Sequence, residues 1–194
     1  MRAPSLRVAR WRAHAPHGAA RLHAWLASSG SLTARLIAHS RAFRVQRLHQ
    51  RTALCLLDEA RAIGMARPGR VWEREVLLRC DDAPVVFAHT VVPMSATVSD
   101  WPLFKALGER SLGSTLFYDP LVARGALEFA RLGAGHPLLL RASAALGIEP
   151  PAELFARRCL YRRCRGVLLV TEVFLPAVLN LKAVHPAAET ESRT

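Results

Sequence analysis

The clearest pattern in the chain is the alternation of side chains over residues 72–80. One face of this stretch carries apolar side chains together with Arg74, and the other face carries two glutamates. A turn sequence, Asp-Asp-Ala-Pro, comes next, and an apolar run over residues 85–92 follows the turn. Two strand-like stretches on either side of a short turn predict an antiparallel hairpin.

A second hairpin is predicted near the C-terminus. Residues 156–164 and 167–175 are strand-like, and a turn at Arg165-Gly166 separates them. Weaker alternation predicts a further strand at residues 42–48, and residues 126–132 are also strand-like. Both faces of residues 167–175 are apolar, so this strand is expected to lie in the middle of the sheet and to be covered on both sides.

The remaining periodic stretches are helical. Ser31 and Asp100 are suitable N-caps for two of them. The predicted helices cover residues 19–28, 31–38, 100–107 and 138–146, and residues 53–65 are ambiguous. Strands joined by hairpins, with helices between them, predict an α+β fold with a mainly antiparallel sheet.

The chain of 194 residues suits a single domain with short tails. We expect residues 1–20 to form a basic, poorly ordered extension and residues 182–194 to form a polar tail. The domain itself is expected to span residues 21–181. Within it, residues 133–155 are rich in Gly and Pro and predict an excursion from the sheet.

The net charge of +12 is uneven, because ten arginines precede the first acidic residue, Asp58. A basic surface that attracts anions explains this as well as nucleic-acid binding does. No helix-turn-helix, ribonucleoprotein or zinc-finger signature is present, so no nucleic-acid partner is expected. No apolar run is long enough to span a membrane, and no secretory signal is recognisable at the start. We therefore expect a cytoplasmic protein whose four cysteines are free thiols.

Two charged residues lie on apolar faces. Arg74 shares its face with apolar side chains, and Glu172 lies within the predicted central strand. A buried lone charge costs several kcal/mol, so each requires a partner. The two residues either pair with each other or with backbone groups, or they line a cavity and bind a polar ligand.

Other candidate residues are weaker. His89 lies near the end of the strand at residues 85–92, where a structural role is more common than a catalytic one. His14, His17 and His23 lie in an Arg-rich stretch, which disfavours a metal site, so no metal is expected. Phosphate-binding loops and hydrolase motifs are absent from the sequence.

Four short segments in this order resemble the chorismate–pyruvate lyase family. They are Trp-Glu-Arg-Glu-Val-Leu-Leu from Trp72, Thr-Val-Val-Pro from Thr90, Leu107-Gly108 followed by Ser-Leu-Gly from Ser111, and Thr-Glu-Val-Phe-Leu-Pro from Thr171. The resemblance implies a six-stranded antiparallel sheet with helices on one side and helical flaps over an internal ligand cavity. It also implies conversion of chorismate to 4-hydroxybenzoate and pyruvate without a cofactor, at the entry to ubiquinone synthesis.

The same resemblance assigns roles to residues. Arg74 would bind the ring carboxylate, Glu172 the ring hydroxyl, and Leu112 would contribute its backbone amide. Leu32 would lie where relatives have Met, a substitution that nearly conserves volume.

Two features depart from the family pattern. Ala88-His89 stands where the family often has Gly-Arg beside the pocket, which would remove an anion contact and add a methyl group. Residues 133–155 resemble an insertion.

An alternative is a non-catalytic, effector-binding domain of the same fold. Such domains occur in transcription regulators, and the absence of a DNA-binding motif argues against this reading here. We expect a monomer in either case.

Overall fold

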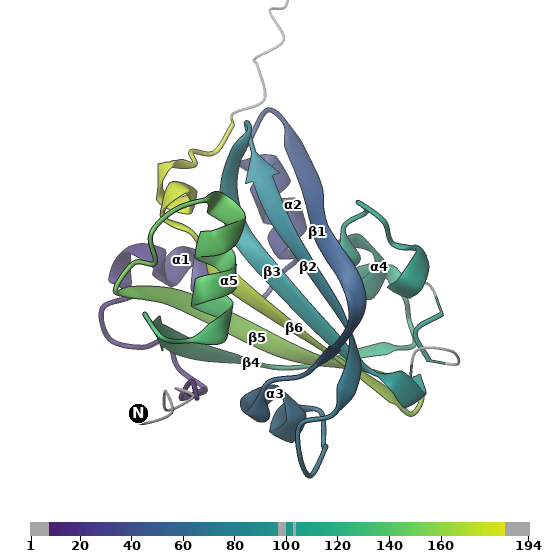
Figure 1. The fold of residues 1–194 in the computed structure, drawn as a ribbon. Coiled ribbons are helices and arrows are strands. Elements are labelled where there is room, and N and C mark those ends of the chain that lie inside the picture. The colour runs from purple at the N-terminus through teal and green to yellow at the C-terminus, as the bar shows by residue number, and fades with distance from the viewer. Residues whose placement is uncertain (1–7, 97–99, 103, 185–194) are drawn as a thin grey trace, which may run out of the picture.

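The computed structural model describes residues 8–96, 100–102 and 104–184. Its centre is a six-stranded antiparallel sheet in the order β1-β2-β3-β6-β5-β4 (Figure 1). The strands are β1 Phe43–Leu54, β2 Arg70–Cys80, β3 Ala83–Pro93, β4 Val122–Gly133, β5 Glu153–Arg163 and β6 Gly166–Phe174. The six predicted strands and the α+β class are confirmed, and β6 has neighbours on both sides.

The two hairpins form as predicted, with one shift of register. Asp81 and Asp82 connect β2 to β3 with φ angles of 47° and 64°, values that short polar side chains tolerate. Between β5 and β6 the turn lies at Cys164 and Arg165, one residue earlier than predicted. This shift decides which residue lies opposite Glu172.

The helices are short, and their bounds are α1 His23–Leu26, α2 Leu32–Ala38, α3 Leu57–Ala62, α4 Leu112–Tyr118 and α5 Pro137–Leu146. The Ser31 hydroxyl accepts a hydrogen bond from the Ala34 amide and caps α2, as predicted. The helix predicted over residues 100–107 is wrong, since the described residues of this stretch form only a 3₁₀ turn at Phe104–Ala106. Trp101, Phe104 and Leu107 pack side by side in one apolar cluster, so tertiary packing overrides the cap signal.

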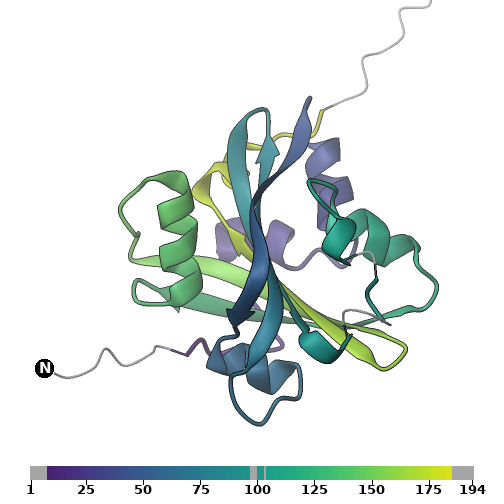
Figure 2. The same ribbon diagram turned by 45° about the vertical axis from the view of Figure 1, so that its right-hand side comes forward.

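The helices cover both faces of the sheet, not the single face that the resemblance implied (Figure 2). Side chains of α1 and α2 pack with Val76 and Phe174, whereas side chains of α5 pack with Leu77 and Val173. Neighbouring residues in a strand point to opposite faces, so these two clusters lie on opposite sides. The predicted helix near residues 138–146 is therefore α5, and it covers the face away from α2.

Part of the predicted N-terminal extension packs on the domain. Arg12 forms an antiparallel bridge with Phe129, and the Trp11 indole donates a hydrogen bond to Asp58. None of the helices in the described ranges is long and apolar enough to cross a membrane. The four cysteines are free thiols.

Candidate functional site

A pocket lies between the sheet and the helices on the α2 side. The atoms around it leave about 550 Å³ of empty space, a volume that includes its opening to solvent. Its walls combine strand residues with the segments 30–33 and 111–116. All five residues that the resemblance placed at the ligand line it: Leu32, Arg74, Ala88, Leu112 and Glu172.

Arg74 is a buried cation in the wall of the pocket. It lies on β2, and only 2% of its surface is exposed. Its Nη2 donates to the carbonyl oxygens of Gly108 (3.0 Å) and Arg110 (2.9 Å), while its Nε is buried without a partner. Burial, together with the charge of Arg47, lowers the pKa of Arg74 to about 10. No carboxylate of a described residue lies within 4.0 Å of Arg74, so its charge is not neutralised by the protein there.

Glu172 has a different partner from the one that the sequence suggested. Its Oε2 accepts a hydrogen bond from Arg157 Nε at 2.5 Å. Arg157 lies directly opposite Glu172 in the β5–β6 pairing, whereas β3 separates Glu172 from Arg74. The backbones of β2 and β6 are thus about 10 Å apart across the sheet. Arg74 and Glu172 therefore do not neutralise each other, whereas the predicted pairing with backbone groups is found for Arg74.

Two helical segments close the pocket on the side away from the sheet. We call residues 30–38, which include α2, the first flap, and residues 108–118, which include α4, the second flap. Thr33 Oγ1 and Ser111 Oγ lie 2.7 Å apart and share a hydrogen bond that joins the two flaps. Arg74 holds the second flap from below through the carbonyls of Gly108 and Arg110. The flaps implied by the resemblance are thus present, and both line the pocket. Figure 2 shows their helices on one side of the sheet.

His89 does not take part in this pocket. It follows Ala88 in β3, so its side chain points to the opposite face. There its ring nitrogens lie 2.9 Å from Glu59 and 3.0 Å from Glu75. Position 89 therefore supplies no anion contact to the pocket, and the expectation that the Ala88-His89 pair removes one is corrected. Because His89 faces away from the pocket, it does not act there as an acid or a base.

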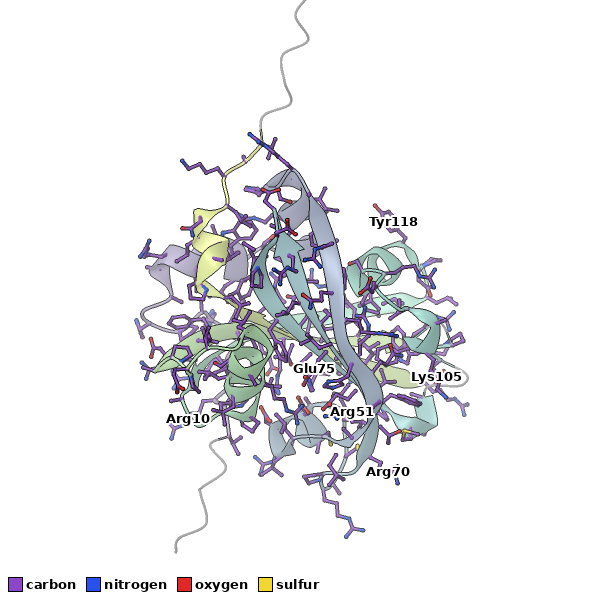
Figure 3. All side chains as sticks on the ribbon, turned by 45° about the horizontal axis from the view of Figure 1, so that its top comes forward. Arg10, Arg51, Arg70, Glu75, Lys105 and Tyr118 are labelled. Atoms are coloured by element: carbon purple, nitrogen blue, oxygen red, sulfur yellow. The ribbon has the colours of Figure 1, made fainter. Side chains whose placement is uncertain are left out.

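His89 belongs to an ion network on the α5 side of the sheet. Arg141 of α5 joins it by donating from Nη1 to Glu73 and Glu75, both at 2.8 Å. Burial alone would lower the pKa of His89, but the two glutamates raise it to about 10. Burial alone would raise the pKa of Glu75, but His89 and Arg141 lower it to about 2. Figure 3 shows Glu75 together with Arg51 of the neighbouring strand β1.

The same network contains the one group of metal-ligating atoms found among the described residues. His49, Glu73 and Glu75 have ligand atoms within 4.8 Å of one another. Arg141 already bridges the two glutamates, and Arg51 Nε lies 3.8 Å from Glu73. These arginines already pair with the glutamates, which makes this a poor metal site.

Sequence reasoning missed Arg157, Arg124 and Tyr161, which also line the pocket. Arg157 and Arg158 are consecutive residues of a strand, so their side chains must point to opposite faces of the sheet. The sequence could therefore have predicted that one of these two arginines lies on the pocket face. Tyr161 is buried, which raises its pKa and keeps the phenol neutral. Nothing in the local sequence marks Arg124.

Comparisons with known proteins agree with this arrangement. A profile of the chorismate lyase family matches residues 7–184. The chain belongs to the chorismate lyase family. A relative from Ralstonia nicotianae, named a probable chorismate pyruvate-lyase, is 54% identical over 157 residues, which cover 79% of this chain and 80% of the relative. A relative of the same name from Cupriavidus metallidurans is 49% identical over 181 residues, covering 90% of this chain and 84% of the relative.

Solved structures with a similar fold include PhnF from Mycobacterium smegmatis. Full-length PhnF matches with a TM-score of 0.54 and 16% identity, covering 82% of this chain and 70% of PhnF. Its effector domain matches with a TM-score of 0.52 and 15% identity, covering 77% of this chain and 90% of the domain. At this identity the likeness shows a shared fold between the chorismate lyase family and these domains.

Proposed function

We propose that the chain is a chorismate pyruvate-lyase, which eliminates pyruvate from chorismate to give 4-hydroxybenzoate, the first step of ubiquinone synthesis. Membership of the chorismate lyase family and the names of the relatives support this activity. The structure adds a pocket whose charges suit the substrate.

The observation that carries the proposal is the unneutralised guanidinium of Arg74. A buried charge without a counter-ion is costly, and a ligand carboxylate would offset that cost on binding. Arg74 Nε has no partner in the described structure, so a donor is available. A planar guanidinium is well suited to bind a planar carboxylate through charge-assisted hydrogen bonds.

The charges that line the pocket also fit the substrate better than the product. Three arginines and one glutamate line it among the described residues: Arg74, Arg124, Arg157 and Glu172. Chorismate carries two carboxylates and 4-hydroxybenzoate carries one. An excess of positive charge therefore favours the dianion and steers it to the pocket.

The remaining roles follow the geometry. Glu172 lies two strands from Arg74 on the same face, so it is placed to accept a hydrogen bond from the hydroxyl at the far end of the ring. Leu112 begins α4, where backbone N–H groups have no partner within the helix. Leu32 on the first flap and Ala88 on β3 limit the space for the ring from opposite sides of the pocket.

The reaction requires little acid or base chemistry from the protein. The ring carbon–oxygen bond to the enolpyruvyl group breaks, the neighbouring ring carbon loses its proton, and the electrons of that C–H bond complete the aromatic ring. The departing enolpyruvate gains a proton at its methylene carbon and becomes pyruvate. We propose that the pocket holds the side chain against that ring hydrogen, excludes water beneath the joined flaps, and stabilises charge on the leaving oxygen.

The test is incubation with chorismate while 4-hydroxybenzoate is followed by its absorbance. We expect turnover by the wild-type chain, and kcat/KM about 10- to 100-fold lower in a folded Arg74→Ala variant. Wild-type turnover in that variant would remove Arg74 from the site. No turnover by the wild type, with 4-hydroxybenzoate still bound, would favour the effector-binding alternative. A chelator is expected to leave the rate unchanged, and loss of activity that added metal restores would contradict the proposal.

We further propose that the working form is a cytoplasmic monomer without a nucleic-acid partner. Free thiols are typical of a reducing compartment. Size-exclusion chromatography with light scattering tests the monomer, and a DNA-binding titration at low salt tests the absence of a nucleic-acid partner.

A further inference from the structure

We propose that Arg157 is a positioning residue that orients Glu172 for the ligand hydroxyl and fixes it to the segment leading into the first flap. The inference rests on the proposed function and adds a residue to its site. It follows from where Arg157 lies and from what each of its nitrogens contacts.

Arg157 is among the largest side chains of the domain that are fully buried. It lies on β5, directly opposite Glu172, and 2% of its surface is exposed. Glu172 is less enclosed, because 19% of its side chain is exposed where it borders the pocket. Both residues line the pocket, and the carboxylate is the more accessible of the two.

The guanidinium divides its donors between two elements. Nε donates to Glu172 Oε2, whereas Nη1 donates to the carbonyls of Trp25 (3.2 Å), Leu26 (3.1 Å) and Ser28 (2.8 Å). These carbonyls lie at the C-terminal end of α1 and just beyond it, where helix carbonyls lack partners within the helix. A single buried cation thus connects the carboxylate to the chain that leads into the first flap.

This arrangement leaves one carboxylate oxygen available. No hydrogen bond of a described residue reaches Glu172 Oε1, so Oε1 can accept the ring hydroxyl while Oε2 remains with Arg157. The ion pair also neutralises Glu172 locally, so the carboxylate does not repel an anionic ligand. Without Arg157, nothing in the described structure would hold Oε2, and the carboxylate would be free to rotate away from the ligand hydroxyl.

The neighbouring residue provides a matched control. Arg158 is also buried, but it points to the opposite face, where it pairs with Glu128 at 2.8 Å and lies over the Trp11 ring. Arg157→Met and Arg158→Met therefore remove the same group from the same strand, one on each side of the sheet. Circular dichroism establishes the temperature at which both variants are folded.

The experiment compares two ligands that differ only in the hydroxyl. Calorimetric titration with 4-hydroxybenzoate and with benzoate measures affinity for each variant. We expect Arg157→Met to lower affinity for 4-hydroxybenzoate about 10- to 100-fold and affinity for benzoate less than about threefold. Arg158→Met is expected to change neither affinity, and Arg157→Lys is expected to recover part of the loss because it keeps the charge.

A second variant keeps the test valid if Arg157→Met does not fold. The double variant Arg157→Met/Glu172→Gln removes both charges of the buried pair and leaves no lone ion. If Arg157 acts through Glu172, the double variant binds 4-hydroxybenzoate about as well as Glu172→Gln alone. Losses that multiply, or equal losses for the two ligands, would overturn the inference. If the wild type neither binds 4-hydroxybenzoate nor converts chorismate, the proposed function fails and this inference fails with it.

Discussion

Buried charged side chains have different kinds of partner on the two faces of the sheet. On the α5 face, Glu73, Glu75 and Glu59 each have a carboxylate oxygen 2.8–3.0 Å from a nitrogen of His89 or Arg141, so their charges are matched. On the pocket face, Arg74 is equally buried but has backbone carbonyls as partners and no carboxylate. The charges on the α5 face are matched without a ligand. The charge of Arg74 would be matched only by a bound anionic ligand.

This difference distinguishes charged residues that stabilise the fold from a charged residue that binds a ligand. Removing one member of a complete buried network leaves an uncompensated ion and destabilises the fold. Removing a charge that has no counter-ion relieves a desolvation cost and instead weakens ligand binding. Burial alone would not distinguish Arg74 from Glu75, because 2% and 4% of their surfaces are exposed.

The largest effect is expected on the α5 face. Glu75→Leu leaves His89 and Arg141 without their shared partner and should lower the free energy of unfolding by about 3–5 kcal/mol. Urea unfolding measures this loss. Glu153→Leu is the control, because Glu153 and its partner Arg131 are exposed and should contribute less than about 1 kcal/mol. Equal losses in the two variants would show that the network is not a stabilising unit.

The same Arg→Met substitution should have opposite effects on the two faces of the sheet. Arg74→Met is expected to weaken 4-hydroxybenzoate binding by about 1.5–3 kcal/mol with little change in stability. Arg141→Met is expected to lower stability and leave binding nearly unchanged. Calorimetric titration and urea unfolding of both variants test the comparison, which fails if both lose stability to the same extent.

The pH dependence of stability should come from the α5 face. His89 has an ordinary pKa of 6.5 and a folded pKa of about 10, so its contribution is full below pH 6.5 and is lost as the pH rises toward 10. The expected slope is at most about 1.4 kcal/mol per pH unit. The contribution of Glu75 is lost as the pH falls from its ordinary pKa of 4.5 toward 2. Urea unfolding between pH 6.5 and 9 should show the alkaline loss in the wild type and a flatter curve in His89→Gln; parallel curves would exclude His89 as its source.

The smallest effect is expected at the pocket wall. Ala88→Gly removes a methyl group that narrows the pocket and should raise affinity for 4-hydroxybenzoate by less than about 0.8 kcal/mol. Ala156→Gly is the control, because Ala156 is a buried strand residue on the other face and carries the same cost of a strand glycine. A weaker affinity in Ala88→Gly alone would show that the methyl group contacts the ligand favourably instead of crowding it.

Local pattern was sufficient for much of the fold. Alternation and apolar runs between turn sequences located all six strands. The Asp81-Asp82 turn pairs Cys80 with Ala83, and an irregularity at Leu78/Arg79 then shifts the β2–β3 register by one residue. Alternation also placed Arg74 and Glu172 on an apolar face. A charge on such a face must acquire a partner, so the sequence alone marked both residues as candidates.

The partners themselves depended on tertiary structure. A turn at Arg165-Gly166 would place Cys159 opposite Glu172, whereas the observed turn one residue earlier places Arg157 there. A shift of one residue at the turn changes every pairing along the hairpin. Arg141 reaches Glu75 only because α5 folds over the far face, and no local signal specifies that docking.

The sequence by itself determined which segments are strands and which residues carry charge into the interior, because both follow from side-chain spacing along one chain. Only the tertiary structure decided that Glu172 pairs with Arg157, that His89 faces away from the pocket, and that Arg74 has no carboxylate partner among the described residues. Those outcomes depend on register, on the side of the sheet that each helix covers and on distances between remote segments. These are properties of the assembled domain, and the spacing of residues along the chain does not contain them.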